Sequence, residues 1–282
     1  MTGTFLKTSL CRAADEVARH HNFERSIESH YATLLKHYNK RPFFYKRALQ
    51  FNRLLIAFSL LSHYFTSTTP LLSQVRDFCA ERKLCSHNSI QSIFLSLRVL
   101  GFIDVTAHAL DARLRVFKPT DKACKEVRAM IASVIDPLAD MGADSDSVHT
   151  LSTLNDYDFL AIYFRGFSEL QKNNVTIDIV FPECHWLIKK EAGHMLILAI
   201  YLDARSSDID GSGFKSSSYL TLGKQLSVSK THVMRLVQEG VERGYFKAHP
   251  KNNLEVLPAF ETMVRRFMSL SFAVGLHCMN LN

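Results

Sequence analysis

"LCSHNSIQSIFLSLRVLGFIDVTAHALDARLRVFKPTDKA", residues Leu84–Ala123, is the stretch that decides the fold, because its pattern changes three times in forty residues. It begins with small polar residues and continues with apolar residues at helical spacing. After Gly101 it alternates through a basic segment. This order predicts a helix over 86–100 with Ser86 as its N-cap, followed directly by a β-hairpin.

The predicted helix has one apolar stripe and one face of hydrogen-bonding side chains. The stripe consists of Ile90, Ile93, Phe94, Leu97 and Leu100. The first turn and the other face present His87, Asn88, Ser89, Gln91, Ser92 and Ser96. Amide and hydroxyl groups at the start of a helix suit the edges of bases in a DNA major groove. Taken alone, the helix is equally well explained as part of a helical hairpin with a polar surface.

The hairpin after Gly101 carries a cluster of cations. Two strands are expected with a turn near 109–111, and Arg113, Arg115 and Lys118 follow that turn. Such a hairpin is the wing of a winged helix-turn-helix, whose arginines bind phosphates or the minor groove. We expect Asp111 to orient the Arg113 guanidinium toward DNA. In the alternative interpretation this pair merely closes the turn.

The pattern occurs twice. Residues 229–247 repeat residues 86–104 at an offset of 143, and residues 196–203 repeat 54–61 at nearly the same spacing. We therefore expect two units, 1–143 and 144–282, with their boundary within Asp136–Val148. In the second unit the residues expected to face DNA are Lys230, Thr231, His232, Arg235, Gln238 and, in its hairpin, Lys251.

Apolar periodicity predicts a mainly α fold with small β-hairpin wings, in which a helical scaffold holds a tandem winged helix-turn-helix as a pseudo-two-fold pair. The helices expected in the first unit are Thr8–His21, Phe23–His37, Phe43–Tyr64, Leu71–Arg82 and Thr120–Ile135. Those expected in the second are Leu151–Lys172, Pro182–Arg205, Leu220–Leu226, Ser229–Gly240 and Ala259–Met279.

Composition narrows the function classes. The net charge is +7, and it divides into +8 (20 cations minus 12 anions) over 1–143 and −1 (14 minus 15) over 144–282. This asymmetry favours a polyanionic partner for the first unit. The apolar runs are too short to cross a membrane and no signal peptide is evident, so a cytoplasmic protein is expected.

The sequence carries no catalytic motif and no metal-ligand spacing. We therefore expect a protein that is not an enzyme and that has no cofactor and no metal. The six cysteines are scattered, which indicates reduced thiols. Cys79 and Cys85 flank the turn before the helix at 86–100, and a redox role for them is the less favoured alternative to inert thiols.

The segment "LDARLRVFKPTDKA" resembles the wing of the MarR family of bacterial transcription regulators, with Asp111, Arg113 and Thr120-Asp121-Lys122 at the signature positions. Pro119 and Ala123 depart from the usual Leu and Gly. The segment 219–247 is similar to the family's helix-turn-helix, although the second hairpin lacks the Asp-x-Arg signature. Together the two resemblances cover about 53–135 and 194–279.

The resemblance implies double-stranded DNA as partner, with recognition helices in the major groove of an operator. Family members are homodimers, so this chain looks like a dimer fused into one polypeptide, which need not read a symmetric site. Whether the fused pair dimerises again stays open. Relatives bind small-molecule effectors between scaffold and winged helix, so an unidentified effector is an open alternative for this chain, although an aromatic core explains the aromatic residues of the scaffold helices more simply. The alternatives are a plasmid-type replication initiator with two winged helices and a protein-interaction scaffold.

Overall fold

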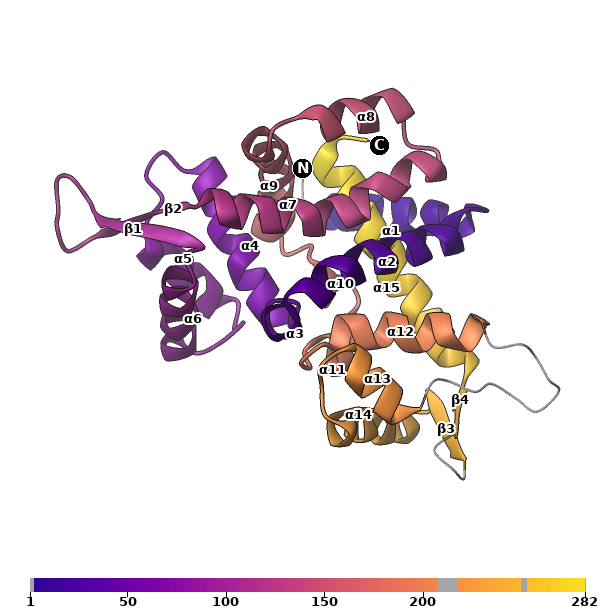
Figure 1. Ribbon diagram of the computed structural model, residues 1–282. Helices are drawn as coiled ribbons and strands as arrows, with labels where there is room; N and C mark the ends of the chain where they lie inside the picture. Colours follow the sequence, from indigo (N-terminus) through magenta and orange to yellow (C-terminus); the bar gives the residue numbers. More distant parts are fainter. Residues whose placement is uncertain (1–2, 207–217, 250–252, 282) are drawn as a thin grey trace.

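The computed structural model describes residues 3–206, 218–249 and 253–281, and it is mainly helical with two small antiparallel hairpins (Figure 1). This coarse fold class, predicted from the sequence, is confirmed. The first half contains α1 Gly3–Arg19, α2 Phe23–Lys40, α3 Pro42–Ala48, α4 Phe51–Thr66, α5 Leu72–Glu81, α6 His87–Val99, β1 Ile103–Ala107, β2 Arg115–Pro119, α7 Asp121–Ile135 and η1 Asp136–Met141. The second half contains α8 Ser145–Thr153, α9 Asp156–Lys172, α10 Ile177–Val180, η2 Pro182–Cys184, α11 His185–Ile188, α12 Gly193–Ser206, α13 Tyr219–Gln225, α14 Lys230–Glu242, β3 Phe246–His249, β4 Asn253–Val256 and α15 Pro258–Met279.

The repeat in the sequence is a repeat in the order of elements. The series α4, α5, α6, β1–β2, α7 has the same helix–helix–helix–hairpin–helix order as α12, α13, α14, β3–β4, α15. In the first hairpin Ile103 lies opposite Pro119, and in the second Phe246 lies opposite Val256. Each hairpin thus begins immediately after the third helix of its series.

The same local chemistry sets the ends of α6 and α14. The side chains of Ser86 and Ser229 accept hydrogen bonds from the backbone N–H groups of Ser89 and His232, at 3.3 and 3.1 Å. Each helix is followed by a glycine with positive φ, 70° at Gly101 and 75° at Gly244. Since side chains disfavour this left-handed conformation, glycine permits the sharp turn from helix to hairpin.

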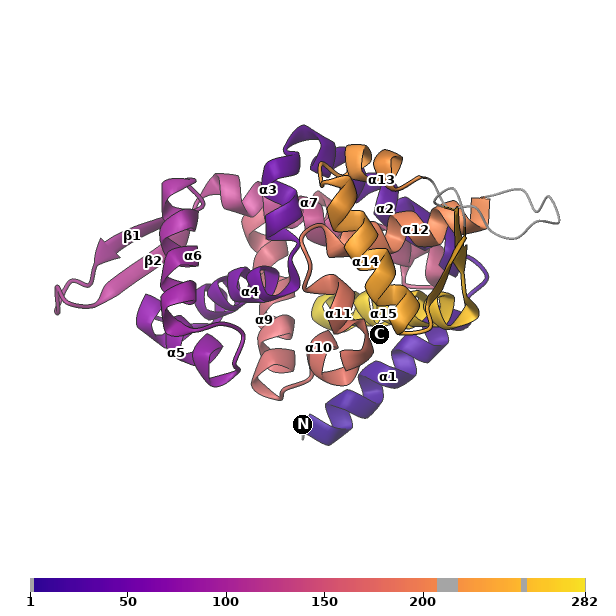
Figure 2. The same ribbon diagram turned by 90° about the horizontal axis from the view of Figure 1, so that it is seen from below.

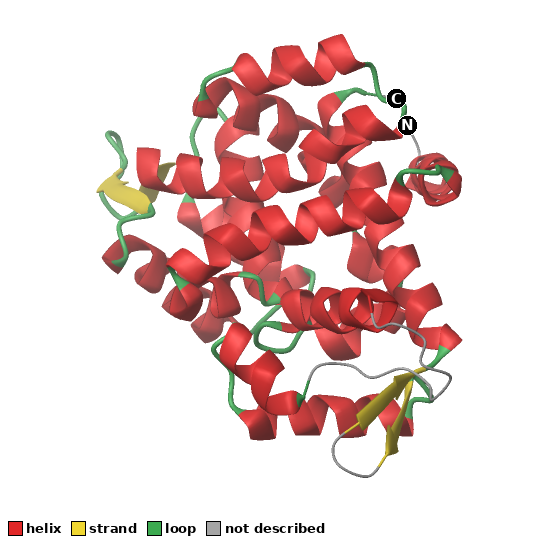
Figure 3. Cartoon of the chain, turned by 45° about the vertical axis from the view of Figure 1, so that its right-hand side comes forward, coloured by secondary structure: helices red, strands yellow, loops and turns green. Residues whose placement is uncertain are grey.

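Both halves contribute to one buried core. Helix α1 packs along α15, α4 packs against α9, and α15 also contacts α7 and α9. The buried side chains of all these helices form a single hydrophobic cluster. Figure 3 shows this crowded helical body, with one hairpin at its edge and the other beyond the lower helices. The predicted units 1–143 and 144–282 therefore share a core.

Polar contacts between the halves follow the repeat. The guanidinium of Arg82, just after α5, donates to the carbonyl of Gln171 at 3.2 Å. Its equivalent 143 residues later, Gln225 at the end of α13, donates to the hydroxyl of Tyr31, also at 3.2 Å. Each series is thus attached to a scaffold helix of the opposite half.

The expected helix Phe43–Tyr64 is wrong, because the chain breaks between α3 and α4. In an unbroken helix the N–H of Gln50 would bond to the carbonyl of Lys46. That carbonyl instead accepts the N–H of Ala192 from the other half, at 2.9 Å, and the Gln50 N–H bonds to Arg47. A contact between residues 146 positions apart therefore ends α3.

Two further expected helices are also divided. Leu151–Lys172 is interrupted at Asn155, whose side chain accepts the N–H of Asp158 at 2.9 Å and begins α9 as its N-cap. Pro182–Arg205 is interrupted at Ala192, which has a φ of 54°. The boundary segment Asp136–Val148 holds η1 and the start of α8, separated by Gly142 with a φ of 87°.

Helices α9 and α15 meet at Gly166. A Cβ at this position would lie 2.7 Å from the Cα of Cys278, a contact that only movement of the backbone relieves. We expect Gly166→Ala to lower the free energy of unfolding by about 1–3 kcal/mol through overpacking. Denaturant unfolding monitored by circular dichroism measures this change. Arg165→Ala, on the exposed side of the same helix, is the control, and an equal loss in both variants would contradict the close approach.

None of the helices within residues 3–206, 218–249 and 253–281 is long and apolar enough to cross a membrane.

Candidate nucleic-acid interface

The helices predicted to enter DNA lie on the same side of the molecule. In Figure 1 both α6 and α14 lie on the lower side, and the view from below in Figure 2 shows them both facing the viewer. The two hairpins project at opposite ends of this side. The elements that sequence reasoning singled out, 143 residues apart, are thus arranged along one face.

The first turns of α6 present free hydrogen-bonding groups. Ile90 and Phe94 are buried and fix the helix on its neighbours. The residues of the opposite face are all exposed, namely His87, Asn88, Ser89, Gln91 and Ser92. Within the described part of the chain, the side-chain amides of Asn88 and Gln91 have no hydrogen-bond partner. These amides are therefore available to an outside partner.

The tip of the first hairpin holds an oriented arginine. The Nε and a terminal nitrogen of Arg113 lie 3.1 and 3.2 Å from the two carboxylate oxygens of Asp111. The N–H of Arg113 also donates to Asp111, at 3.0 Å. These hydrogen bonds hold the pKa of Asp111 below its usual range. The Arg113 side chain is nevertheless 91% exposed, so the pair presents its guanidinium to solvent.

The other cations of this hairpin differ in how free they are. Arg115 donates to the carbonyl of Ala112 at 3.1 Å and keeps its charge without an acidic partner among the described residues. Lys118 lies opposite Asp104 across the strands, with its Nζ 3.6 Å from the carboxylate. We expect Arg113 and Arg115 to contribute more to an anionic partner than Lys118 does.

The second helix, α14, is less open than α6. Lys230, Thr231 and Arg235 are exposed. His232 is half-buried, and its Nε2 lies 3.0 Å from the carbonyl of Glu191. Gln238 is exposed but donates to Glu242 at 3.4 Å. The sequence predicted these five residues as equivalent contacts to DNA. In the structure the bond from His232 to Glu191, between α11 and α12, instead gives His232 a role in holding α14 in place.

Two basic side chains of the second hairpin contact a carboxylate within the hairpin. Lys247 and His249 both contact the carboxylate of Glu255, at 3.2 and 2.8 Å. The predicted contact Lys251 lies outside the described residues. This local pairing agrees with the net charge of −1 over the second half.

Sequence reasoning missed two cations beside the start of α14. Lys46 of α3 donates to the carbonyl of Ser227 at 3.4 Å, in the turn between α13 and α14. Arg47 lies 3.5 Å from Glu191, the residue whose carbonyl holds His232. These cations come from the first half, about 180 residues earlier, and no local pattern connects them with α14.

One of the two cysteines that flank the turn before α6 is buried. Burial raises the pKa of Cys79 to about 11, so this thiol stays protonated at neutral pH, which argues against the redox alternative. Among the described residues, no group of three or more His, Cys, Asp or Glu side chains is placed to hold a metal ion.

One histidine pair joins the halves in the core. The Nε2 atoms of His30 on α2 and His194 on α12 lie 3.1 Å apart, and the Nδ1 of His30 lies 3.1 Å from the carbonyl of Ser133. Burial lowers the pKa of His30 to about 4 and that of His194 to about 3. Both rings are therefore neutral at pH 7. All three groups are satisfied when His30 carries its proton on Nδ1 and His194 carries its proton on Nε2.

Comparison with known proteins finds no family model, no curated protein and no solved structure that matches this chain. A functional assignment consequently depends on the geometry of the face formed by α6, α14 and the hairpins.

Proposed function

We propose that this protein is a sequence-specific, double-stranded DNA-binding transcription regulator built from two winged helix-turn-helix units. The observation that carries the proposal is the pairing of α6 with the first hairpin. Exposed amides without partners on the helix suit base edges in the major groove. An exposed, oriented guanidinium on the adjacent hairpin suits phosphates or the minor groove.

The first unit is the principal reader in this proposal. Its hairpin carries Arg113, which is 91% exposed although paired with Asp111, and Arg115, which has no acidic partner among the described residues. In the second hairpin Glu255 contacts both Lys247 and His249. The second unit keeps Arg235 and Thr231 exposed on α14, so it adds a weaker second half-site. Two unlike readers on one chain favour an asymmetric DNA site, with half-sites about one helical turn or more apart.

Selection of bound sequences from a random duplex pool tests the proposal. We expect one asymmetric site of about twenty base pairs. Asn88→Ala and Gln91→Ala should each reduce discrimination at one or two positions of the strong half-site by about tenfold or more. Arg235→Ala should do the same in the weak half-site.

Thr150→Ala, at an exposed position on α8 on the upper side of the molecule in Figure 1, is the control and should leave the selected sequence unchanged. Recovery of no consensus, together with unchanged binding in all three variants, would remove the case for base reading.

Two rival functions give different outcomes in the same assays. A replication initiator of the plasmid type, which also joins two winged helices, would select a repeat found at an origin rather than sites upstream of genes. A protein-interaction scaffold would not retard DNA in a gel. Removing the cations of the first hairpin would leave the binding activity of such a scaffold intact. The exposed amides of α6 beside an exposed, oriented arginine favour the regulator over the scaffold, because together they suit base edges and phosphates.

A further inference from the structure

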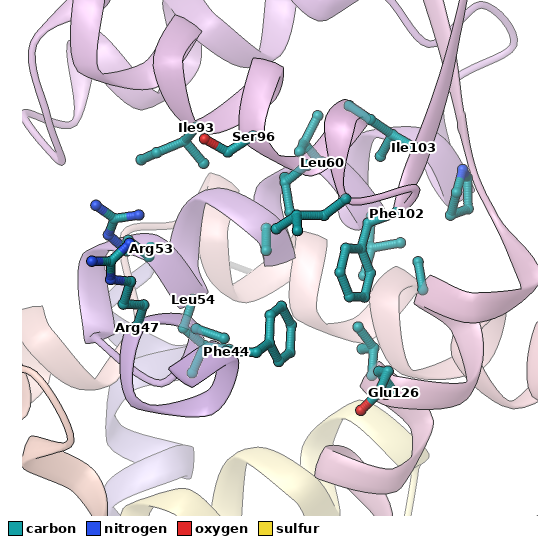
Figure 4. Close-up of a pocket in the computed structure, with 18 of the residues that line it drawn as sticks. Phe44, Arg47, Arg53, Leu54, Leu60, Ile93, Ser96, Phe102, Ile103 and Glu126 are labelled. Atoms are coloured by element: carbon teal, nitrogen blue, oxygen red, sulfur yellow. The ribbon is translucent and has the colours of Figure 1, made fainter. Parts of the chain in front are cut away.

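An apolar cleft lies against the later turns of α6, away from the amino-terminal turns that present the amides. It has a volume of about 710 Å³, and helices α3, α4, α6 and α7 contribute most of its walls. Its floor includes Leu54, Phe44 and Phe102. The rings of Phe44 and Phe102 stack, with their centroids 4.9 Å apart. Figure 4 shows these side chains directed into the cleft, with Arg47 and Arg53 together at one side.

The rim of this cleft is apolar and exposed. Phe43 on α3 is 74% exposed, and on α6 Leu95 and Val99 are 61% and 77% exposed. Leu100, next to the end of α6, adds a fourth exposed apolar side chain. Contiguous apolar surface of this kind is unusual on a monomeric protein and marks an interaction site.

The second half supplies an internal comparison. Phe44 corresponds to Trp186 at an offset of 142, and Phe102 corresponds to Tyr245 at 143. The ring of Trp186 stacks on Tyr245 at 5.5 Å and also closes over α14. A Cβ at Gly240, which corresponds to Leu97, would lie 3.2 Å from Trp186 and 2.3 Å from Phe246. The equivalent region of the second half is therefore only partly filled, because a smaller and more open hollow of about 480 Å³ remains there, lined by Trp186, Lys189 and Arg243 among others.

The rim differs between the halves in the same way. The positions of Leu95, Val99 and Leu100 are occupied in the second half by Gln238, Glu242 and Arg243, respectively. One copy of the duplicated element thus has a smaller hollow with a polar, charged rim, and the other has a larger cleft with an apolar rim. Duplication alone does not produce this difference, which makes the first-half cleft a candidate for a binding role of its own.

We infer that this cleft is a docking groove for an acidic amphipathic helix of a partner protein. Lining residues Ile93 to Leu100 extend over about two turns of α6, roughly 10 Å, which matches the spacing of apolar anchors at i, i+4 and i+7 on a bound helix. A helix lying between α3 and α6 covers Phe43 and Val99 together. A small molecule on the floor of the cleft would leave both exposed.

The charges of the cleft indicate the sign of the partner. Three of its four charged lining residues are arginines, Arg41, Arg47 and Arg53, and the fourth is Glu126. Arg41 is paired with Glu126, at 2.5 Å. Arg53 is exposed and donates to the neutral side chain of Gln50, with no acidic partner among the described residues. Arg47 lies 3.5 Å from Glu191, so Arg53 is the arginine that lacks an acidic partner among the described residues. The polar flank of the partner helix is therefore expected to carry Glu or Asp near Arg53.

Phage display of randomised 20-residue peptides on the immobilised full-length chain tests the inference. The counter-selection target is a triple variant, Leu95→Gln, Val99→Glu and Leu100→Arg, in which each rim residue is replaced by the residue at the corresponding position of the second half. We expect enriched peptides with net negative charge and apolar residues at i, i+4 and i+7. A fluorescein-labelled winner should bind the triple variant at least tenfold more weakly and Arg53→Glu about three- to tenfold more weakly.

Ile179→Gln, which changes an exposed apolar residue outside the cleft, should leave the peptide affinity unchanged. Circular dichroism and thermal unfolding establish that each variant is folded. The inference is overturned if no peptide distinguishes the native chain from the triple variant, or if the winners are basic. It is also overturned if sedimentation shows a dimer that the triple variant loses, which assigns the groove to a second copy. Saturable decanoate binding without peptide enrichment would assign it to a small ligand and overturn it as well.

Discussion

Replacing Arg113 and Arg115 together by alanine is expected to lower the affinity for any duplex DNA by about 10- to 100-fold at roughly 0.1 M salt. Each arginine is expected to neutralise one phosphate, and each lost phosphate contact releases about one counterion fewer on binding. The slope of log affinity against log salt should therefore become shallower by about 2. Fluorescence anisotropy of a labelled duplex at several salt concentrations measures both quantities.

The second hairpin is the matched control for this prediction. Lys247→Ala with His249→Ala also removes two basic side chains, but both contact Glu255 in the native hairpin. We expect the affinity to change by less than about threefold, because Glu255 offsets the charge of this pair, whereas Arg115 of the first hairpin has no acidic partner among the described residues. Equal losses from the two hairpins would mean that the readers are equivalent, and the asymmetric model would be wrong.

Local signals in the sequence were sufficient to predict the elements that form the face of α6, α14 and the two hairpins. Ser86 and Ser229 begin their helices, and Gly101 and Gly244 end them, because caps and positive φ depend on the residue itself. Asn155 carried the same kind of signal for the start of α9, and the prediction of one helix over 151–172 overlooked it.

Features that depend on tertiary contacts were beyond local reasoning. The break between α3 and α4 arises because Ala192 takes the carbonyl of Lys46, and neither residue is a helix breaker. Leu100 was expected on the buried stripe of α6, but it is exposed at the rim of the open cleft. Whether a histidine such as His232 faces DNA or bonds to Glu191 likewise depends on which backbone lies opposite it.

The stability of the whole fold is expected to fall steeply as the pH drops from about 6.5 toward 4, because of the His30–His194 pair. Both histidines have folded-state pKa values, about 4 and about 3, below the value near 6.5 of an unfolded chain. The stabilisation is therefore complete above pH 6.5, where both states are neutral. It is lost as the pH falls, since the unfolded chain takes up protons that the folded core excludes. Between pH 7 and 4.5 the two groups together contribute a decrease of roughly 3–5 kcal/mol in the free energy of unfolding.

Chemical denaturation at half-unit pH steps measures this decrease, and the comparison is with His30→Leu/His194→Leu. The variant keeps the surface carboxylates whose pKa values are lowered, such as Asp111 and Glu255, so their titration cancels in the difference between the two curves. We expect the variant to lose most of the pH dependence between 6.5 and 4.5, whatever its stability at pH 7. If the double variant does not fold, His194→Leu alone should remove about half. Parallel curves for native and variant protein would show that the pair takes up protons in the folded state as readily as in the unfolded one, and that it does not hold the halves together as a neutral unit.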